Sequence, residues 1–310
     1  MTIDRDSNQA AASIAIGEAL REAFYPLFKN GKTALKLTIF PALAITLLSV
    51  LSMYLSTELI VSDLSNLGNF NPGSALQQIA LSLATMLITL LISLQFYVCW
   101  IRFRFKGEND MRSGLITSLQ KRNWVVFGKL LLLVIASYLV LGVFMLVFAF
   151  ALDNSLPEFI KVGLFLAIMA LYCILLLRFS YVIPAAALDE PYGFGDSWRH
   201  TRGQSLKLFG SFLLLSLIWF VALFILSLAF FLLAGIVSIF LPSLGNGETF
   251  TQFLFIMMTS YRFLYLQLPL QFAFIVISFL LFLPHLNMLL YCFRTNTGWA
   301  DDHEIAERFS

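Results

Sequence analysis

Arginines, carboxylates, a serine and a tryptophan are concentrated between residues 178 and 204 of this 310-residue sequence. In one interpretation Arg178 pairs with Asp189, Glu190 or Asp196, and the ion pair holds a loop against the ends of neighbouring helices. In the other, several arginines form a basic pocket for a lipid phosphate, with a tryptophan seated in the headgroup layer. The candidate residues are Arg178, Asp189, Glu190, Ser197, Trp198, Arg199 and Arg202.

Motifs typical of enzymes do not accompany this cluster. The sequence contains no GxxxxGK[ST], HExxH or GxSxG motif, no GxGxxG after a strand, and no paired spacing among its 3 cysteines. We therefore expect no catalytic residues, no metal, no cofactor and no enzymatic activity. A membrane-embedded enzyme acting on lipids stays an alternative, because His200 lies near Asp189, Glu190 and Asp196 in the sequence.

The elements that carry the cluster are apolar and long. Hydrophobic residues make up 59% of the chain and charged residues 12%, about half of the share usual in soluble proteins. Six apolar segments each reach the length of about 20 residues that a helix needs to cross a bilayer. The composition therefore predicts an all-α integral membrane protein with six transmembrane helices. The expected spans are 35–56, 77–101, 124–150, 159–182, 208–241 and 265–292.

Two segments depart from this simple pattern. The fifth span is longer than a bilayer needs, so we expect a tilt, a break near Gly235 or an extension outside the membrane. Residues 242–264 include a short apolar stretch, which suits an interfacial or re-entrant helix better than a seventh span. Pro184 is expected to end the fourth transmembrane helix.

The distribution of Lys and Arg predicts the orientation of the spans. Of the 20 Lys and Arg residues, only Lys161 and Arg262 fall on the side of the loops 57–76, 151–158 and 242–264. Basic residues concentrate on the cytoplasmic side of membrane proteins, so both termini are predicted to be cytoplasmic. The predicted organisation is a disordered N-terminus at 1–7, a single membrane domain at 8–294 and a cytoplasmic tail at 295–310.

An internal repeat is a further hypothesis. An amphipathic stretch, two apolar spans and an arginine at the inner boundary follow one another three times, in 8–102, 111–178 and 195–294. In the first of these, residues 8–28 are too polar to cross a bilayer and are expected to lie in its interface. Alternation of basic loops with apolar spans, which any multi-pass protein shows, is the alternative explanation.

Few polar side chains fall inside the expected spans. They are Gln95, Gln267, Gln271, His285 and Asn287. A shared polar cavity formed by the glutamines and the histidine would indicate a transporter or a lipid translocase. Hydrogen bonds between helices are the other interpretation of His285 and Asn287, with a proton relay as a third.

The cluster at 178–204 also resembles a known family. Arg178, Pro184, the acidic pair Asp189–Glu190 and the SWRHTRG segment at 197–203 resemble the six-helix membrane domain of bacterial glycerophosphodiester phosphodiesterases and its free-standing relatives. The resemblance implies a bacterial inner-membrane location but not the phosphodiesterase, because this chain has no room for that catalytic barrel. We expect a non-enzymatic protein that binds or organises membrane lipids, with anionic phospholipid headgroups as partners, or that scaffolds envelope proteins. Nucleic acid is not an expected partner, since the basic residues follow the membrane boundary.

Overall fold

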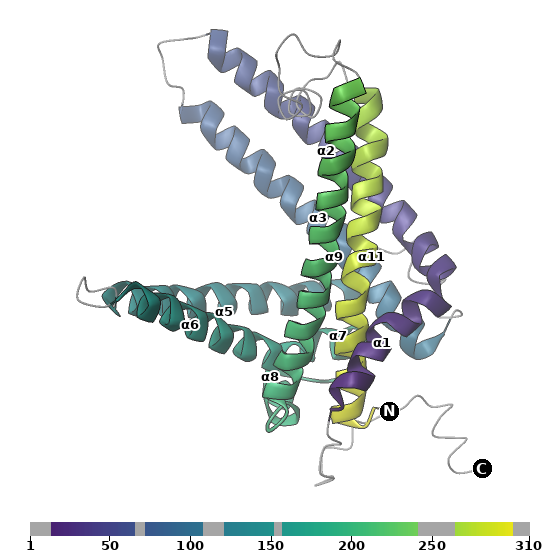
Figure 1. Ribbon diagram of the computed structural model, residues 1–310, viewed down its shortest axis with the longest axis vertical. Coiled ribbons are helices and arrows are strands. Elements are labelled where there is room, and N and C mark those ends of the chain that lie inside the picture. Colours follow the sequence, from purple (N-terminus) through teal and green to yellow (C-terminus); the bar gives the residue numbers. More distant parts are fainter. Residues whose placement is uncertain (1–13, 66–71, 108–120, 152–156, 241–263, 300–310) are drawn as a thin grey trace. The chain divides into compact units, whose positions relative to one another are not determined.

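A computed structural model describes residues 14–65, 72–107, 121–151, 157–240 and 264–299 (Figure 1). Every regular element within these ranges is a helix, as the apolar periodicity predicted. The helices are α1 (Ile16–Lys29), α2 (Gly31–Ser65), α3 (Pro72–Lys106), α5 (Lys121–Ala151), α6 (Glu158–Phe179), α7 (Val182–Ala187), α8 (Phe194–His200), α9 (Ser205–Phe240) and α11 (Leu264–Thr297).

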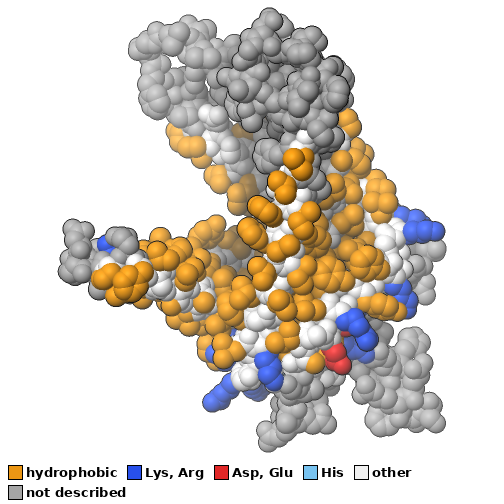
Figure 2. Space-filling model, viewed as in Figure 1, with side chains coloured by type: hydrophobic (Ala, Val, Ile, Leu, Met, Phe, Trp, Pro, Cys, Tyr) orange, Lys and Arg blue, Asp and Glu red, His pale blue; other side chains and the backbone are white. Residues whose placement is uncertain are grey.

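Six segments of these helices are long and apolar enough to cross a membrane, which supports a multi-pass membrane protein. Many of their large apolar side chains are exposed on the protein surface, where only lipid could remove them from water. Figure 2 shows these hydrophobic side chains covering most of the visible face of the described helices. The segments are Gly31–Ser56, Leu76–Lys106, Lys121–Leu146, Phe159–Ala187, Ser205–Ile225 and Gln271–Thr297.

The fifth span is not broken at Gly235. Helix α9 continues through this glycine to Phe240 over 36 residues. Of the three alternatives for this span, the break is therefore wrong, because a single glycine costs only about 1 kcal/mol in a helix and the flanking apolar residues continue the pattern. The tilt and the extension stay predictions. Residues 241–263 lie outside the described part of the chain, so an interfacial or re-entrant helix there stays a prediction.

The helix that forms most of the fourth span ends before Pro184, not at it. Helix α6 ends at Phe179, and Pro184 lies in the first turn of the short helix α7. A proline ring clashes with the carbonyl four residues earlier, which here belongs to Ser180, directly after α6. The proline therefore separates the two helices while fitting into the first turn of the second.

Contacts divide the chain into two compact units, which do not follow the boundaries of the expected repeats. Unit 1 comprises residues 1–37, 90–212 and 283–310, and unit 2 comprises 38–89 and 213–282. In unit 2, the Thr85 hydroxyl of α3 donates a hydrogen bond to the Ser52 hydroxyl of α2 at 3.2 Å. The candidate residues at 178–204 all belong to unit 1, where the largest buried side chains include Trp100, Tyr181 and Phe293.

Helix α1 packs in unit 1 through its small residues. Ala19 and Ala23 are fully buried, whereas Phe28 is 81% exposed and Ile16 and Tyr25 are also exposed. Residues four positions apart share one helix face, and a face without long side chains lets two helices approach closely. The side chains of Ile16, Tyr25 and Phe28 consequently point away from the core of unit 1.

Candidate functional site

The loop at 188–193, between α7 and α8, begins with a backbone conformation that few residues adopt. The Glu190 N–H donates to the Ala185 carbonyl at 2.9 Å and the Asp189 N–H donates to the Ala186 carbonyl at 3.2 Å. This pair of hydrogen bonds is the Schellman motif, which normally places glycine at the position held here by Asp189. Asp189 has φ 66°, and no other described residue except glycine has a positive φ. Such strain persists only where the surroundings compensate for it.

Two arginines from distant helices provide that compensation. Arg102 donates to Asp189 Oδ2 at 2.9 Å and also to the Ala187 carbonyl at 3.1 Å. Arg122 donates to Asp189 Oδ1 at 2.8 Å. Burial alone would raise the pKa of Asp189, but the hydrogen bonds and charges of Arg122 and Arg102 outweigh it and hold the pKa below its ordinary value. The carboxylate therefore ties α3 and α5 to the end of α7.

The expected pairing of Arg178 with an acidic residue is wrong. Among the described residues, no carboxylate lies within ion-pair distance of Arg178, because its guanidinium lies over the Trp198 ring at 3.7 Å from the centroid. The backbone of Arg178 is held separately, since its carbonyl accepts a hydrogen bond from the Ser197 hydroxyl at 2.6 Å. Arg178 Nε is buried, and no residue in the described ranges forms a hydrogen bond with it. Arg178, Ser197 and Trp198 thus form one contact between α6 and α8.

The remaining members of the sequence cluster serve other contacts. Arg199 pairs with Asp196 at 3.2 Å on the exposed surface of α8, and Arg202 lies exposed in the turn that follows. Glu190 Oε1 accepts a hydrogen bond from the Trp299 indole N–H at 3.3 Å. The cluster is therefore divided into an ion-pair centre at Asp189, a cation stacked on Trp198, and a solvated edge. Figure 2 shows Lys and Arg side chains on the part of unit 1 that carries α1 and α8.

His200 does not join the neighbouring carboxylates. Its Nδ1 lies 2.9 Å from the Asp196 backbone carbonyl and 3.1 Å from the Tyr192 hydroxyl, and its ring stacks on Tyr192. Desolvation lowers the pKa of His200, and burial raises the pKa of Tyr192. No hydrogen bond or ion pair connects His200 with the carboxylates of Asp189, Glu190 or Asp196 in the described structure. The arrangement that the enzyme alternative required is thus not assembled.

An apolar groove of about 350 Å³ lies between α5 and α6, beside the stacked Arg178. Phe179 and Phe194 line the groove, and both belong to the aromatic group around Trp198, with Phe179 and Trp198 centroids 5.4 Å apart. The positively charged Arg178 is therefore the sequence neighbour of Phe179, which lines this apolar groove in a predicted span. The remaining lining residues are Leu132, Leu133, Ala136, Ser137, Val140, Tyr172, Leu175 and Leu176.

The polar residues of the spans have different environments. Asn287 is 2% exposed and connects three helices, because its Oδ1 accepts from the Trp100 indole at 2.8 Å and its Nδ2 donates to the Ala23 carbonyl at 3.0 Å. The His285 ring packs on Phe212, with centroids 6.2 Å apart. Gln95 belongs to unit 1 and Gln271 to unit 2, while the side chain of Gln267 lies outside the described structure.

Sequence reasoning missed the partners of Asp189 and the role of Trp100. Arg102 and Arg122 each stand at the end of an apolar span, which is the available signal, but several other arginines share that position. In the described ranges, no group of three or more His, Cys, Asp and Glu side chains could hold a metal ion.

Gly203 and Gly195 provide a matched pair for testing the turn after α8. A methyl group added at either position would meet no atom within 4 Å, but Gly203 has φ +80° whereas Gly195 lies in α8. Gly203→Ala should therefore lower the free energy of unfolding by about 1 kcal/mol, because an L-residue is strained there. Gly195→Ala should raise it by about 0.5 kcal/mol. Melting temperatures of the two purified variants in detergent check the difference, and equal shifts would contradict it.

Comparison of the chain with protein-family models, with curated proteins and with solved structures finds no match. The proposal that follows therefore rests on the residues and contacts described above.

Proposed function

We propose that this protein is a non-enzymatic membrane protein that binds a phospholipid, with one acyl chain in the groove between α5 and α6 and the phosphate beside Arg178. The observation that carries the proposal is the position of the Arg178 guanidinium, 3.7 Å from the Trp198 centroid and adjacent to the groove-lining Phe179. A phospholipid has the same order of parts, with an anionic phosphate joined through glycerol to long apolar chains.

The energetics favour such a ligand. Burial of an acyl chain contributes about 0.8 kcal/mol for each CH₂ group, and a nearby Lys or Arg adds about 1 kcal/mol for an anionic lipid. The groove wall is almost entirely apolar, with Ser137 and Tyr172 as its polar residues. Arg178 Nε has no hydrogen-bond partner among the described residues, so an incoming phosphate oxygen would satisfy a buried donor.

The finer assignments from the sequence belong to the same proposal. We propose that both termini are cytoplasmic, that the membrane is the bacterial inner membrane, and that the chain is built from three repeats of an amphipathic helix and a hairpin. The resemblance to the membrane domain of glycerophosphodiester phosphodiesterases supports the bacterial location. Lipid binding at the inner surface agrees with a role in organising lipids or scaffolding envelope proteins.

Native mass spectrometry with lipid identification tests the proposal on protein purified gently from its own membrane. Arg178→Gln removes the cation, and Ala136→Phe fills the exposed groove without changing charge. Each change should reduce occupancy of the retained phospholipid about tenfold, the effect of losing roughly 1.4 kcal/mol. Arg21→Gln is the matched control, because Arg21 is an exposed arginine of α1 outside the groove. Equal lipid retention by all four proteins would refute lipid binding at this groove.

A further inference from the structure

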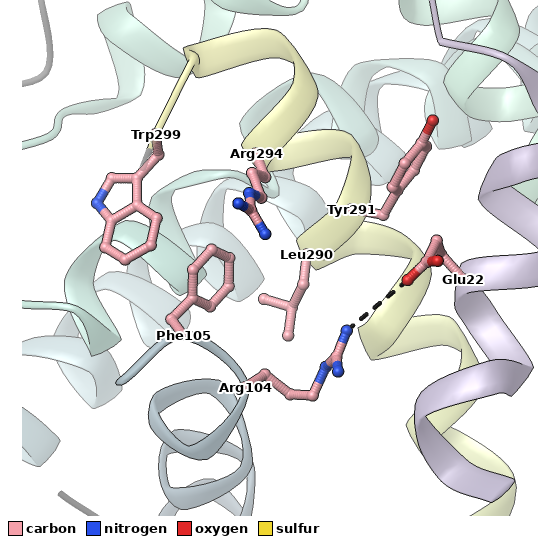
Figure 3. A pocket seen from close by; sticks show the side chains of 7 residues that line it. All are labelled: Glu22, Arg104, Phe105, Leu290, Tyr291, Arg294 and Trp299. Atoms are coloured by element: carbon pink, nitrogen blue, oxygen red, sulfur yellow. Dashed lines mark ion pairs between the residues drawn. The ribbon is translucent and has the colours of Figure 1, made fainter. Parts of the chain in front are cut away.

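A second cavity lies in unit 1, separate from the groove between α5 and α6. It has a volume of about 160 Å³ and is formed by residues of α1, α3 and α11 together with Trp299, which follows α11 (Figure 3). A single water molecule needs about 15 Å³ of accessible space, so the cavity has room for a group with several oxygen atoms. The lining residues are Glu22, Arg104, Phe105, Leu290, Tyr291, Arg294 and Trp299.

Positive charge exceeds negative charge in this cavity. Arg104 lines it from α3 and Arg294 from α11; in Figure 3 the Arg104 guanidinium points toward Glu22, and the Arg294 guanidinium lies beyond Leu290, on the side of Phe105. Glu22 is the one acidic side chain among the described residues of the lining, and its carboxylate lies 3.9 Å from Arg104, at the limit of an ion pair. Two guanidinium groups that line one partly enclosed cavity give it a positive potential, which favours an anion there.

The hydrogen-bonding groups of the cavity are divided between its wall and its interior. Tyr291 donates to Glu18 at 2.9 Å and Trp299 donates to Glu190 at 3.3 Å, so both aromatic side chains are held in place by their polar atoms. The Phe105 and Trp299 rings pack edge to face, with centroids 4.6 Å apart. Arg104 Nε is buried without a hydrogen-bond partner. The cavity therefore combines a fixed aromatic wall with a donor that nothing in the described protein satisfies.

We infer that this cavity binds a phosphate group, which Arg104 and Arg294 hold by charge-assisted hydrogen bonds. Guanidinium groups match the geometry of phosphate oxygens, and two arginines suit a group with more than one negative oxygen. Both arginines stand at or near the end of an apolar span, the level at which lipid headgroups lie. The phosphate thus comes either from a phospholipid headgroup or from a free phosphate ion. This site shares no residue with the groove that Arg178 flanks.

Two binding measurements on delipidated full-length protein distinguish the two sources. Equilibrium dialysis measures binding of radiolabelled inorganic phosphate, and native mass spectrometry in nanodiscs measures retention of phosphatidylglycerol against diacylglycerol, which lacks the phosphate. Arg294→Gln should lower the affinity for one of these phosphates about tenfold or more, because hydrogen bonds to charged groups contribute about 1.5–3 kcal/mol. Arg294 is exposed, so its loss should leave the fold intact. Arg199→Gln, which removes an exposed arginine from α8, is the control.

Glu22→Gln gives a result that misfolding could not produce. Removing the carboxylate that faces Arg104 should raise the phosphate affinity severalfold, since the anion no longer competes with Glu22. Weaker phosphate binding by Arg294→Gln together with stronger binding by Glu22→Gln supports the inference. The assay that shows both changes identifies whether the phosphate is a free ion or a lipid headgroup. No binding of either phosphate by the wild type, or equal binding by wild type and Arg294→Gln, overturns it. Arg178→Gln should leave this cavity unaffected, so the groove and the cavity fail independently.

Discussion

Asp189→Asn is expected to lower the free energy of unfolding by about 2 kcal/mol, a large effect for one change of atom. The Arg102 side chain is only 7% exposed and would lose its counterion, whereas the Asp189 side chain is 47% exposed, which reduces the effect below that of a fully buried pair. Asparagine tolerates the left-handed conformation better than most residues, so the substitution changes charge and leaves the backbone of the loop unstrained. Thermal unfolding in detergent micelles measures the loss.

Two controls separate the Asp189 centre from general surface electrostatics. Arg199→Gln breaks an exposed pair and should cost less than about 0.5 kcal/mol. Combining Asp189→Asn with Arg102→Met should recover part of the loss, because no buried charge then lacks a partner. If Asp189→Asn unfolds at the temperature of the wild type, the two ion pairs do not stabilise the fold.

The stabilisation at Asp189 should also depend on pH in a defined direction. The pKa of Asp189 in the folded protein lies below its ordinary value of 3.8, so the folded state binds the proton less readily than the unfolded state. The contribution is therefore fully present above the ordinary pKa and is lost as the pH falls through the lowered value. The difference in stability between wild type and Asp189→Asn should stay constant from pH 7 to about pH 5 and shrink below about pH 4.

Asn287→Leu is expected to cost about 2 kcal/mol, because it removes both hydrogen bonds that join α1, α3 and α11. The indole N–H of Trp100 would remain buried without an acceptor, since Trp100 is fully buried. Trp100→Phe alone should cost a similar amount by leaving Asn287 Oδ1 without its donor. The melting temperature of each purified variant reports these losses.

The double variant decides whether the hydrogen bond or simple packing is responsible. With Trp100→Phe and Asn287→Leu together, neither partner remains polar, so the combined loss should be smaller than the sum of the two single losses. Additive losses would show that the two side chains act independently. Leu289→Ala is a packing control on α11, because this residue is only partly buried.

The membrane character of the chain was predictable because it depends on local properties. Apolar length alone identifies a segment that can cross a bilayer, and each of the six membrane-length segments overlaps one of the expected spans. The separation of α6 from α7 was also predictable, because the Pro184 ring clashes with the carbonyl of the residue four positions before it. The position of the helix end at Phe179 rather than at the proline follows from that same spacing.

The partners of the candidate residues could not be predicted in the same way. Asp189 lies 87 residues from Arg102 and 67 from Arg122 in the sequence, yet it contacts both. Arg178 is much closer to Asp189 in the sequence but forms no ion pair with it. Trp100 and Asn287 are 187 residues apart, yet they share a hydrogen bond. Charge and polarity indicate that such side chains need partners. Many side chains of suitable type lie at the ends of the spans, so the sequence does not show which of them form the contact.

By itself, then, the sequence of this protein determined its helical class and its six membrane-length segments, because these depend on composition and periodicity. Only the tertiary structure decided that Asp189 joins Arg102 and Arg122, that Arg178 stacks on Trp198, and that Arg104 and Arg294 line one cavity. The physical reason is that helix packing decides which side chains meet. Two helix faces that pack together can be far apart in the sequence, so sequence distance does not predict their contact.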